Sequence, residues 1–129
     1  MGEREKEEMR YMSVIVKNAA KTAGLDSGEY GYDSWREYWE HNGGWNFWLF
    51  RGIKRVNENG QKKWKLTFRC PACGKNYLWN GTAPDCFDGC HVNIVGDATK
   101  KLYITPLCHT CNQKNITADV LKVNLVPAP

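Results

Sequence analysis

The 129-residue sequence predicts one small α+β domain with a β-hairpin and an N-terminal helical extension. Three observations support this prediction. Apolar residues recur at helical spacing in the first part of the chain, strand-like runs flank an Asn-Gly pair after it, and two Cys-x-x-Cys pairs follow. We therefore expect residues 1–44 to form the helical extension and residues 45–129 to form a domain built around the cysteines.

The first predicted element is a helix over residues 3–22. Its apolar side chains recur at steps of three and four residues: Met9, Met12, Ile15, Val16 and Ala19. Glutamates crowd the first turns, where the helix dipole favours negative charge, and Gly24 can end the helix. These features predict one amphipathic helix near the start of the chain.

A second, shorter helix is predicted within "YDSWREYWEHNGG". Ser34 and Glu37 have the spacing of a capping box at its start, and the Asn-Gly-Gly sequence ends it. Trp35, Tyr38 and Trp39 fall on one face of this helix. An aromatic face at helical spacing is typical of a helix that packs on a core, so we assign these rings to the core.

Two strands are predicted in "WNFWLFRGIKRV" and "KKWKLTFRC", on either side of "NENG". Asn-Gly between two such runs is the strongest short signal for a tight hairpin turn. The second strand alternates between two sets of side chains, with Trp64, Leu66 and Phe68 on one side and Lys63, Lys65, Thr67 and Arg69 on the other. Because side chains alternate across a strand, the hairpin has one apolar and one basic face.

The second half of the chain predicts a further pair of short strands and a short helix. "CHVNIV" and "KKLYITPL" have strand character and are joined by "GDATK", while "CHTCNQKN" is expected to open the helix. The segment between the hairpin and these strands is rich in loop residues. The tail "ADVLKVNLVPAP" is predicted as coil bounded by prolines or as an edge strand.

Four cysteines have the spacing of a metal site. Cys70 and Cys73 form the first Cys-x-x-Cys pair, and Cys108 and Cys111 form the second after 34 intervening residues. Two such pairs supply the four soft ligands that a tetrahedral zinc ion prefers, so we predict one structural zinc ion here. The alternative is two redox-active or unliganded pairs. A zinc ion with four sulfur ligands has no open position for chemistry.

Cys86 and Cys90 lie between these pairs and leave two alternatives open. A free, buried cysteine is the common outcome. The other alternative is a second metal site that one or both cysteines share with His91 or His109, or an exchange with a cysteine of the first site.

The charge of the chain is concentrated in its middle. Residues 51–78 carry eight Lys or Arg against one Glu, whereas residues 26–50 carry one Arg against five acidic residues. A basic segment of this kind is the footprint expected for a partner that carries phosphates, and the alternative is an ordinary solvated face. The candidate nucleic-acid contacts are Arg51, Lys54, Arg55, Lys62, Lys63, Lys65 and Arg69. Trp45, Trp48 and Trp79 are candidates for base stacking or for the core.

The sequence has neither a long apolar run nor the apolar core of a secretion signal near its start. We therefore expect a cytoplasmic protein that does not associate with membranes. A reducing compartment also favours metal binding over disulfides for the six cysteines.

Residues 66–129 resemble the treble-clef zinc module of HNH-type endonucleases. The segments "CPACG", "GCHV" and "YITPLCHTCN" follow one another in the order of that module, in which the second cysteine pair opens a helix. The resemblance is close to small bacterial and phage proteins with a "GAHV…YIVPLCxxCN" pattern. It implies a treble-clef fold, DNA as partner and, for an active enzyme, a catalytic Mg²⁺ or Mn²⁺ ion.

The resemblance also implies site residues. His91 stands where the family has its general base, and Asp88, three residues earlier, is the candidate acidic ligand of the catalytic metal. The family's asparagine before the second cysteine pair and its final helix histidine have no counterpart, since "KKLYITPL" and Asn112 stand there. The chain is thus expected to retain a reduced catalytic site.

These observations lead to one functional hypothesis and two alternatives. The hypothesis is a zinc-stabilised HNH-like module that interacts with nucleic acid, with DNA as the expected partner and with reduced or absent nuclease activity. The first alternative is an active metal-dependent endonuclease that uses His91 as general base. The second is a protein-interaction module, for example an inhibitor in phage or host defence, which docks through the acidic and aromatic segment 26–50.

Overall fold

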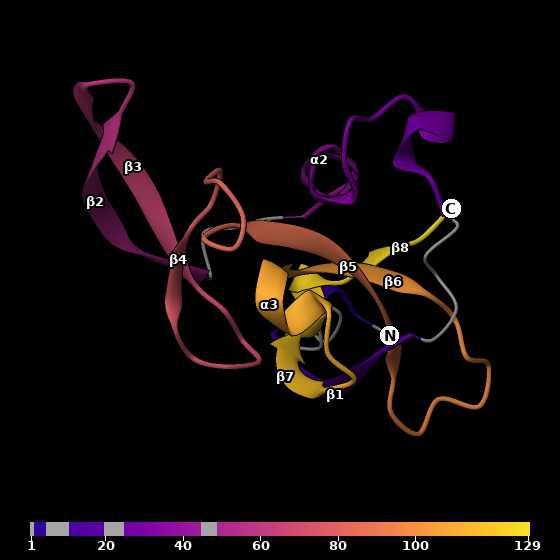
Figure 1. Ribbon diagram of the computed structural model, residues 1–129. Helices are drawn as coiled ribbons and strands as arrows, with labels where there is room; N and C mark the ends of the chain where they lie inside the picture. Colours follow the sequence, from indigo (N-terminus) through magenta and orange to yellow (C-terminus); the bar gives the residue numbers. More distant parts are fainter. Residues whose placement is uncertain (1, 5–10, 20–24, 45–48) are drawn as a thin grey trace.

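The computed structural model describes residues 2–4, 11–19, 25–44 and 49–129. Their strands form two antiparallel sheets (Figure 1). The larger sheet has five strands in the order β7 (Thr117–Leu121), β1 (Ser13–Asn18), β5 (Phe87–Ile94), β6 (Tyr103–Cys108) and β8 (Val126–Pro127). The smaller sheet has three strands in the order β2 (Phe50–Glu58), β3 (Gln61–Arg69) and β4 (Asn76–Leu78). The predicted α+β class is confirmed to the extent that helices accompany sheets that are mostly antiparallel.

Few helices accompany these sheets in the described residues. The helices whose bounds lie within the described residues are α2 (Trp35–His41), α3 (His109–Asn112) and the 3₁₀ turns η1 (Ser27–Tyr30) and η3 (Lys122–Asn124). Glu3 and Arg4, at the start of the predicted first helix, are also helical. None of these helices is long and apolar enough to cross a membrane. In Figure 1, α2 lies over β5 and β6, and α3 lies beside them at the end of β6.

The predicted helix over residues 3–22 is wrong where β1 forms. Val16 is 1% exposed and Val14 is half-buried, whereas Ile15 between them is 54% exposed, which is the two-residue period of a strand. β1 pairs with β5 on one side and with β7 on the other. The β-branched run Val-Ile-Val favours this pairing because it packs well on a pleated surface. Residues 5–10 and 20–24 of the predicted helix lie outside the described residues.

The second predicted helix is confirmed as α2, which begins as the sequence indicates. The side chain of Ser34 accepts a hydrogen bond of 3.1 Å from the backbone N–H of Glu37. Trp39 is fully buried, and its indole N–H donates to the backbone oxygen of Asn124 at 2.8 Å. A Cβ on Gly89 of β5 would lie 2.3 Å from the backbone carbon of Trp35, so glycine permits this close approach. Both β1 and α2, which fall in the predicted extension, therefore pack with the rest of the chain.

The predicted hairpin is confirmed as β2 and β3, which pair from Phe50 opposite Phe68 to Glu58 opposite Gln61. Asn59 and Gly60 form the turn with positive φ angles of 51° and 77°, as a tight primed turn requires. Figure 1 shows that the hairpin extends away from the five-stranded sheet. The first residues of the predicted strand, 45–48, lie outside the described residues.

The apolar face of the hairpin reaches the core only at its base, which the sequence did not predict. Phe68 is 1% exposed and its ring lies 4.9 Å from that of Trp79, but Leu66 is 49% and Trp64 is 65% exposed. The core lies between α2 and the two sheets and includes Trp79, whose indole N–H donates to the Glu40 carboxylate at 2.6 Å. The side chains near the tip of the hairpin therefore face solvent.

The other elements predicted for the second half also form, but the segment that was expected to be loop-rich contains β4 and the first residues of β5. β5 and β6 pair antiparallel, although β5 starts at Phe87, three residues before the predicted strand. The predicted short helix is α3. The tail supplies both edge strands of the larger sheet, β7 and β8, so the edge-strand alternative holds for these residues.

Candidate metal centre

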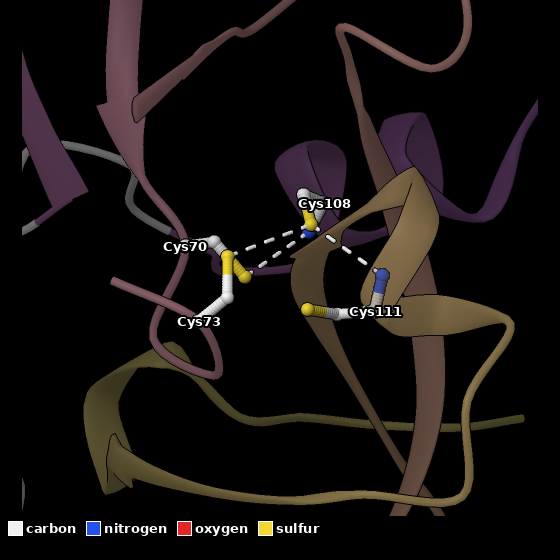
Figure 2. A group of neighbouring side chains, drawn as sticks. All are labelled: Cys70, Cys73, Cys108 and Cys111. Carbon is white, nitrogen blue, oxygen red and sulfur yellow. Dashed lines mark hydrogen bonds between the residues drawn. The ribbon is translucent and has the colours of Figure 1, made fainter. Parts of the chain in front are cut away.

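The two cysteine pairs lie on different elements that the fold brings together. Cys70 directly follows β3, and Cys73 lies in the turn that leads to β4 (Figure 2). Cys108 is the last residue of β6, and Cys111 lies in α3. Gly74 follows the first pair with φ of 74°, a left-handed conformation that lets the turn close behind the sulfurs.

The four cysteine sulfurs form one cluster, in which all of them lie within 4.8 Å of one another. The sulfurs of Cys73 and Cys108 are 4.0 Å apart. Ligands about 2.3 Å from a tetrahedral zinc ion are separated by about 3.8 Å, so the cluster already has the spacing of a metal site. All six cysteines are free, which excludes a disulfide among them in this structure.

Backbone N–H groups point at these sulfurs. The N–H of Cys108 donates to Cys70 Sγ at 3.4 Å, and the N–H of Cys111 donates to Cys108 Sγ at the same distance (Figure 2). Such bonds stabilise negative charge on sulfur, which is the form that binds a metal. The cluster is therefore arranged for thiolates.

The ionisation of the cysteines follows from their burial. Burial raises the pKa of Cys70, whose side chain is fully buried. Burial also acts to raise the pKa of Cys73, but hydrogen bonds from the backbone of Lys75 and from the Tyr77 hydroxyl outweigh it and lower the pKa to about 7. Metal binding must therefore displace the proton of the buried Cys70 thiol, whereas the lowered pKa of Cys73 eases the loss of its proton. Four sulfurs and no open position fit a structural metal ion such as zinc.

His91 does not lie in an open catalytic site. Its side chain is 7% exposed, and the Trp35 ring packs edge-on against it with the ring centroids 4.6 Å apart. Burial lowers the pKa of His91, and its Nε2 atom has no hydrogen-bond partner among the described residues. In the described residues, two clusters of side chains could hold a metal ion, namely the four cysteines and a second group described below. His91 belongs to neither of them. This geometry does not favour the predicted general base.

Asp88 faces a different histidine from the one that the sequence suggested. Its Oδ2 atom lies 2.7 Å from Nδ1 of His109 and accepts a hydrogen bond of 3.0 Å from the side chain of Asn112. Cys86 joins Asp88 and His109 in a second cluster, in which one ligand atom of each lies within 4.8 Å of the others. The sequence analysis left open a second metal site that Cys86 shares with His109. It assigned Asp88 instead to the candidate catalytic site with His91.

Cys90 is a free, buried cysteine. Its thiol donates to the side-chain oxygen of Asn18 at 3.0 Å, which links β5 to the end of β1. Burial, followed by the nearby charges of Asp88 and Cys70, raises the pKa of Cys90 to about 12. The structure therefore supports a free, buried cysteine at this position rather than a metal ligand.

The predicted basic contacts divide among three places on the hairpin. Lys54, Lys63 and Lys65 share one face with Glu58, whose carboxylate lies 2.5 Å from Lys65 and 3.9 Å from Lys63. Arg51 and Arg69 line a cavity of about 490 Å³ beside Cys70 and Cys73. Arg55 and Lys62 lie on the face of the exposed apolar residues.

We call this last group the hairpin patch, and it consists of Ile53, Arg55, Lys62, Trp64 and Leu66. Ile53 is paired with Leu66 across the strands, and Arg55 is paired with Trp64. The guanidinium of Arg55 lies over the Trp64 ring, 5.9 Å from its centroid, as in a cation–π contact. Of the predicted stacking residues, Trp79 is buried, and Trp45 and Trp48 lie outside the described residues.

The cysteine cluster joins the two sheets, because Cys70 follows the central strand of the smaller sheet and Cys108 ends a strand of the larger one. A metal ion at this junction would fix the hairpin relative to the five-stranded sheet. Comparison with models of protein families, with curated proteins and with solved structures found no match to this chain.

Proposed function

We propose that this chain is a zinc-stabilised treble-clef module of the HNH-like class that binds nucleic acid, with DNA as the expected partner. The proposal has three parts, which are the identity of the metal, the class of the fold and the surface that binds. The projecting hairpin with its exposed tryptophan and cations is the observation that carries the proposal.

The donor set supports zinc as the metal. Four cysteine sulfurs within 4.8 Å of one another are soft ligands, which select zinc over the hard ions magnesium and calcium. Three of these cysteines are buried, so the bound ion would be closed to substrate. Zinc in this cluster has a structural role, and no step of catalysis passes through it.

The order of the elements supports a treble-clef arrangement. The first pair, Cys70 and Cys73, lies in the turn between β3 and β4. The β5–β6 hairpin follows, and the second pair opens α3 directly after it. This order of knuckle, hairpin and helix is that of the module which the sequence resembles, although α3 is only four residues long.

The shape and chemistry of the hairpin support nucleic acid as the partner. A two-stranded β-ribbon fits into the major groove of DNA, and the β2–β3 hairpin extends freely from the rest of the chain (Figure 1). Trp64 and the cations beside it offer a ring for base stacking and positive charge for phosphates. In the described residues no ion pair engages Lys54, Arg55 or Lys62, so these charges are available to a partner.

The surroundings of His91 support reduced or absent nuclease activity. A general base must come within hydrogen-bond reach of the water that it activates, and the Trp35 ring packs against the His91 ring. We expect no plasmid cleavage with magnesium or manganese. Cleavage by the wild-type protein that is lost in His91→Ala would instead establish the active endonuclease, with His91 as base and Asp88 as candidate metal ligand.

The test of the proposal is binding of fluorescent duplex DNA, measured by anisotropy across a range of salt concentrations. Each phosphate contact adds about 0.9 to the slope of log affinity against log salt. The double variant Arg55→Ala/Lys62→Ala is expected to bind more weakly and to lower that slope by about 2. The matched control is Lys17→Ala/Lys114→Ala, which removes two lysines that line a separate cavity away from the hairpin. Binding that is absent, or equal slopes for both variants, would refute the proposal.

A second candidate function is docking of a protein on the same surface. The exposed apolar side chains of the hairpin patch favour it, because Ile53 is 60% and Trp64 is 65% exposed. Association that survives high salt and fails in Trp64→Ala would favour a protein partner. Binding that weakens steeply with salt would favour nucleic acid.

A further inference from the structure

We propose that Cys86, Asp88 and His109 form a second metal site, which binds a borderline divalent transition ion such as zinc and is separate from the four-cysteine centre. The three residues come from two parts of the chain. Cys86 and Asp88 flank the start of β5, and His109 is the first residue of α3. This inference does not depend on the nucleic-acid function proposed above.

The ligand atoms already converge. One sulfur, one carboxylate oxygen and one imidazole nitrogen lie within 4.8 Å of one another. The closest pair is His109 Nδ1 and Asp88 Oδ2 at 2.7 Å, which is a hydrogen bond. A metal ion would take the place of the shared proton, and the two groups would need to separate by only a fraction of an ångström, since ligands about 2.0–2.2 Å from zinc lie a little over 3 Å apart.

The backbone fixes the relative position of two of these residues. The N–H of His109 donates to the backbone oxygen of Cys86 at 3.0 Å, and this bond ties α3 to the residue before β5. The cluster is therefore assembled by main-chain geometry as well as by side chains. Cys108 and Cys111, which flank His109, are committed to the first centre and would hold α3 in place when that centre is filled.

Neighbouring amides orient the ligands, as outer-shell groups do in metal sites. Asn112 donates to Asp88 Oδ2 at 3.0 Å, and the side chain of Gln113 lies 3.2 Å from Nε2 of His109. Both of these bonds to the Asp88 carboxylate use its Oδ2 atom. The imidazole thus has its Nδ1 atom toward the cluster. A metal ion on Nδ1 leaves the ring proton on Nε2, so the Gln113 amide would then turn its oxygen to that N–H.

A cavity adjoins this cluster and leaves room for a fourth ligand. Cys86, Asp88 and Asn112 line a cavity of about 660 Å³, which also contains Asp26 and Asp33 in its wall. Three carboxylates against the single guanidinium of Arg36 give this wall a net negative charge that favours a cation. Three protein ligands with an open fourth position are the arrangement of zinc sites that bind water or a ligand atom, in contrast to the closed four-cysteine centre.

The donor chemistry decides the class of metal. A thiolate and an imidazole are poor ligands for magnesium or calcium, which prefer oxygen. One sulfur, one nitrogen and one oxygen suit zinc or cobalt. The site is thus distinct from a nuclease site for magnesium, and it does not use His91.

The experiment measures zinc per chain by elemental analysis after equilibrium dialysis against buffered free zinc. We expect two zinc ions in the wild-type protein and one in Cys86→Ser and in Asp88→Asn. The matched controls are Cys90→Ser, which replaces a buried cysteine outside both clusters, and Asp97→Asn, which replaces a carboxylate in the β5–β6 connection. Both controls are expected to retain two zinc ions.

Cobalt substitution locates the second ion. With five cobalt–sulfur bonds in the wild-type protein and four in Cys86→Ser, the cobalt–thiolate absorbance is expected to fall by about one fifth. Circular dichroism of each variant establishes that the protein is folded. Equal zinc content in the wild-type protein and in both ligand variants, or an unchanged cobalt spectrum in Cys86→Ser, would overturn the proposal.

Discussion

His91 is a buried histidine whose ring packs against Trp35, and this position makes its charge costly. Burial lowers the pKa of His91 in the folded protein below its ordinary value of 6.5. At this residue, the unfolded chain therefore binds more protons than the folded chain between the lowered folded pKa and about pH 6.5. The stabilising contribution of neutral His91 is present above that pH and is lost as the pH falls toward the folded pKa.

We expect His91→Phe to flatten the acid side of the stability profile. Phenylalanine keeps a ring beside Trp35 and removes the unpartnered Nε2 atom, so stability at pH 7 should change by less than about 1 kcal/mol. Urea denaturation from pH 7 to pH 5 should show a smaller loss of stability in the variant than in the wild-type protein. Identical profiles for both proteins would show that His91 does not titrate in this way.

At the level of residues, local signals were predictable from the sequence and contacts between distant residues were not. The Ser34 cap, the Asn59-Gly60 turn and the four cysteines depend on short spacing, which is visible in one dimension. The bond between Asp88 and His109 depends on how β5 docks against α3, and the chain separates these residues by 21 positions. The burial of His91 likewise depends on Trp35, which comes from α2.

β1 shows how an element can be mistaken when its apolar run is short. Residues 14–16 satisfy a helical spacing together with Met12 and Ala19, and they also satisfy a strand with Val14 and Val16 inward. Pairing with β5 and β7 decides between the two, because the position between these strands buries Val16, which is 1% exposed. Sequence spacing alone contains no information on that pairing.

Two matched substitutions distinguish the strand from the helix. Val16→Asp places a charge in the core and is expected to lower the free energy of unfolding by about 4 kcal/mol. Ile15→Asp changes an exposed side chain of the same strand and is expected to cost less than about 1 kcal/mol. Urea denaturation measures both values. A similar loss in the free energy of unfolding for both variants would be inconsistent with the alternation of buried and exposed side chains along β1.

β3 has the same alternation along an element that is only partly covered. Phe68 is buried at the base of the hairpin, whereas Trp64 on the same face is exposed near its tip. The sequence predicted the two faces of the hairpin correctly. It did not indicate that the apolar face is left uncovered near the tip by the rest of the described residues. Exposed apolar side chains of this kind mark surfaces that bind partners.

The contrast along β3 gives a prediction that separates stability from binding. Phe68→Ala is expected to lower the free energy of unfolding by about 3–5 kcal/mol because it leaves a cavity in the core. Trp64→Ala is expected to change stability by less than about 1 kcal/mol and to weaken DNA binding through the loss of a stacking ring. Thermal melts and anisotropy on the same samples test this. A large loss of stability in Trp64→Ala would show that its exposed ring contributes to the fold.

At the scale of the whole molecule, the four-cysteine centre joins two sheets that also share one hydrophobic core. A structural metal ion stabilises only the folded chain, so its binding free energy adds to the stability of the fold. We expect a strong chelator to abolish the cooperative thermal transition, and Cys70→Ser to have the same effect without a chelator. Cys90→Ser should keep its transition. A transition that is unchanged by chelation would mean that the cysteines are not held by a metal.

The most direct test of the account is nuclear magnetic resonance of the zinc-loaded, ¹⁵N-labelled protein during titration with duplex DNA. We expect the shifts to concentrate on residues 53–66 and on the indole N–H of Trp64, while the buried indole N–H of Trp39 keeps its position. Shifts confined to the five-stranded sheet or to α2, or no shifts at concentrations that saturate ordinary DNA-binding modules, would contradict the account.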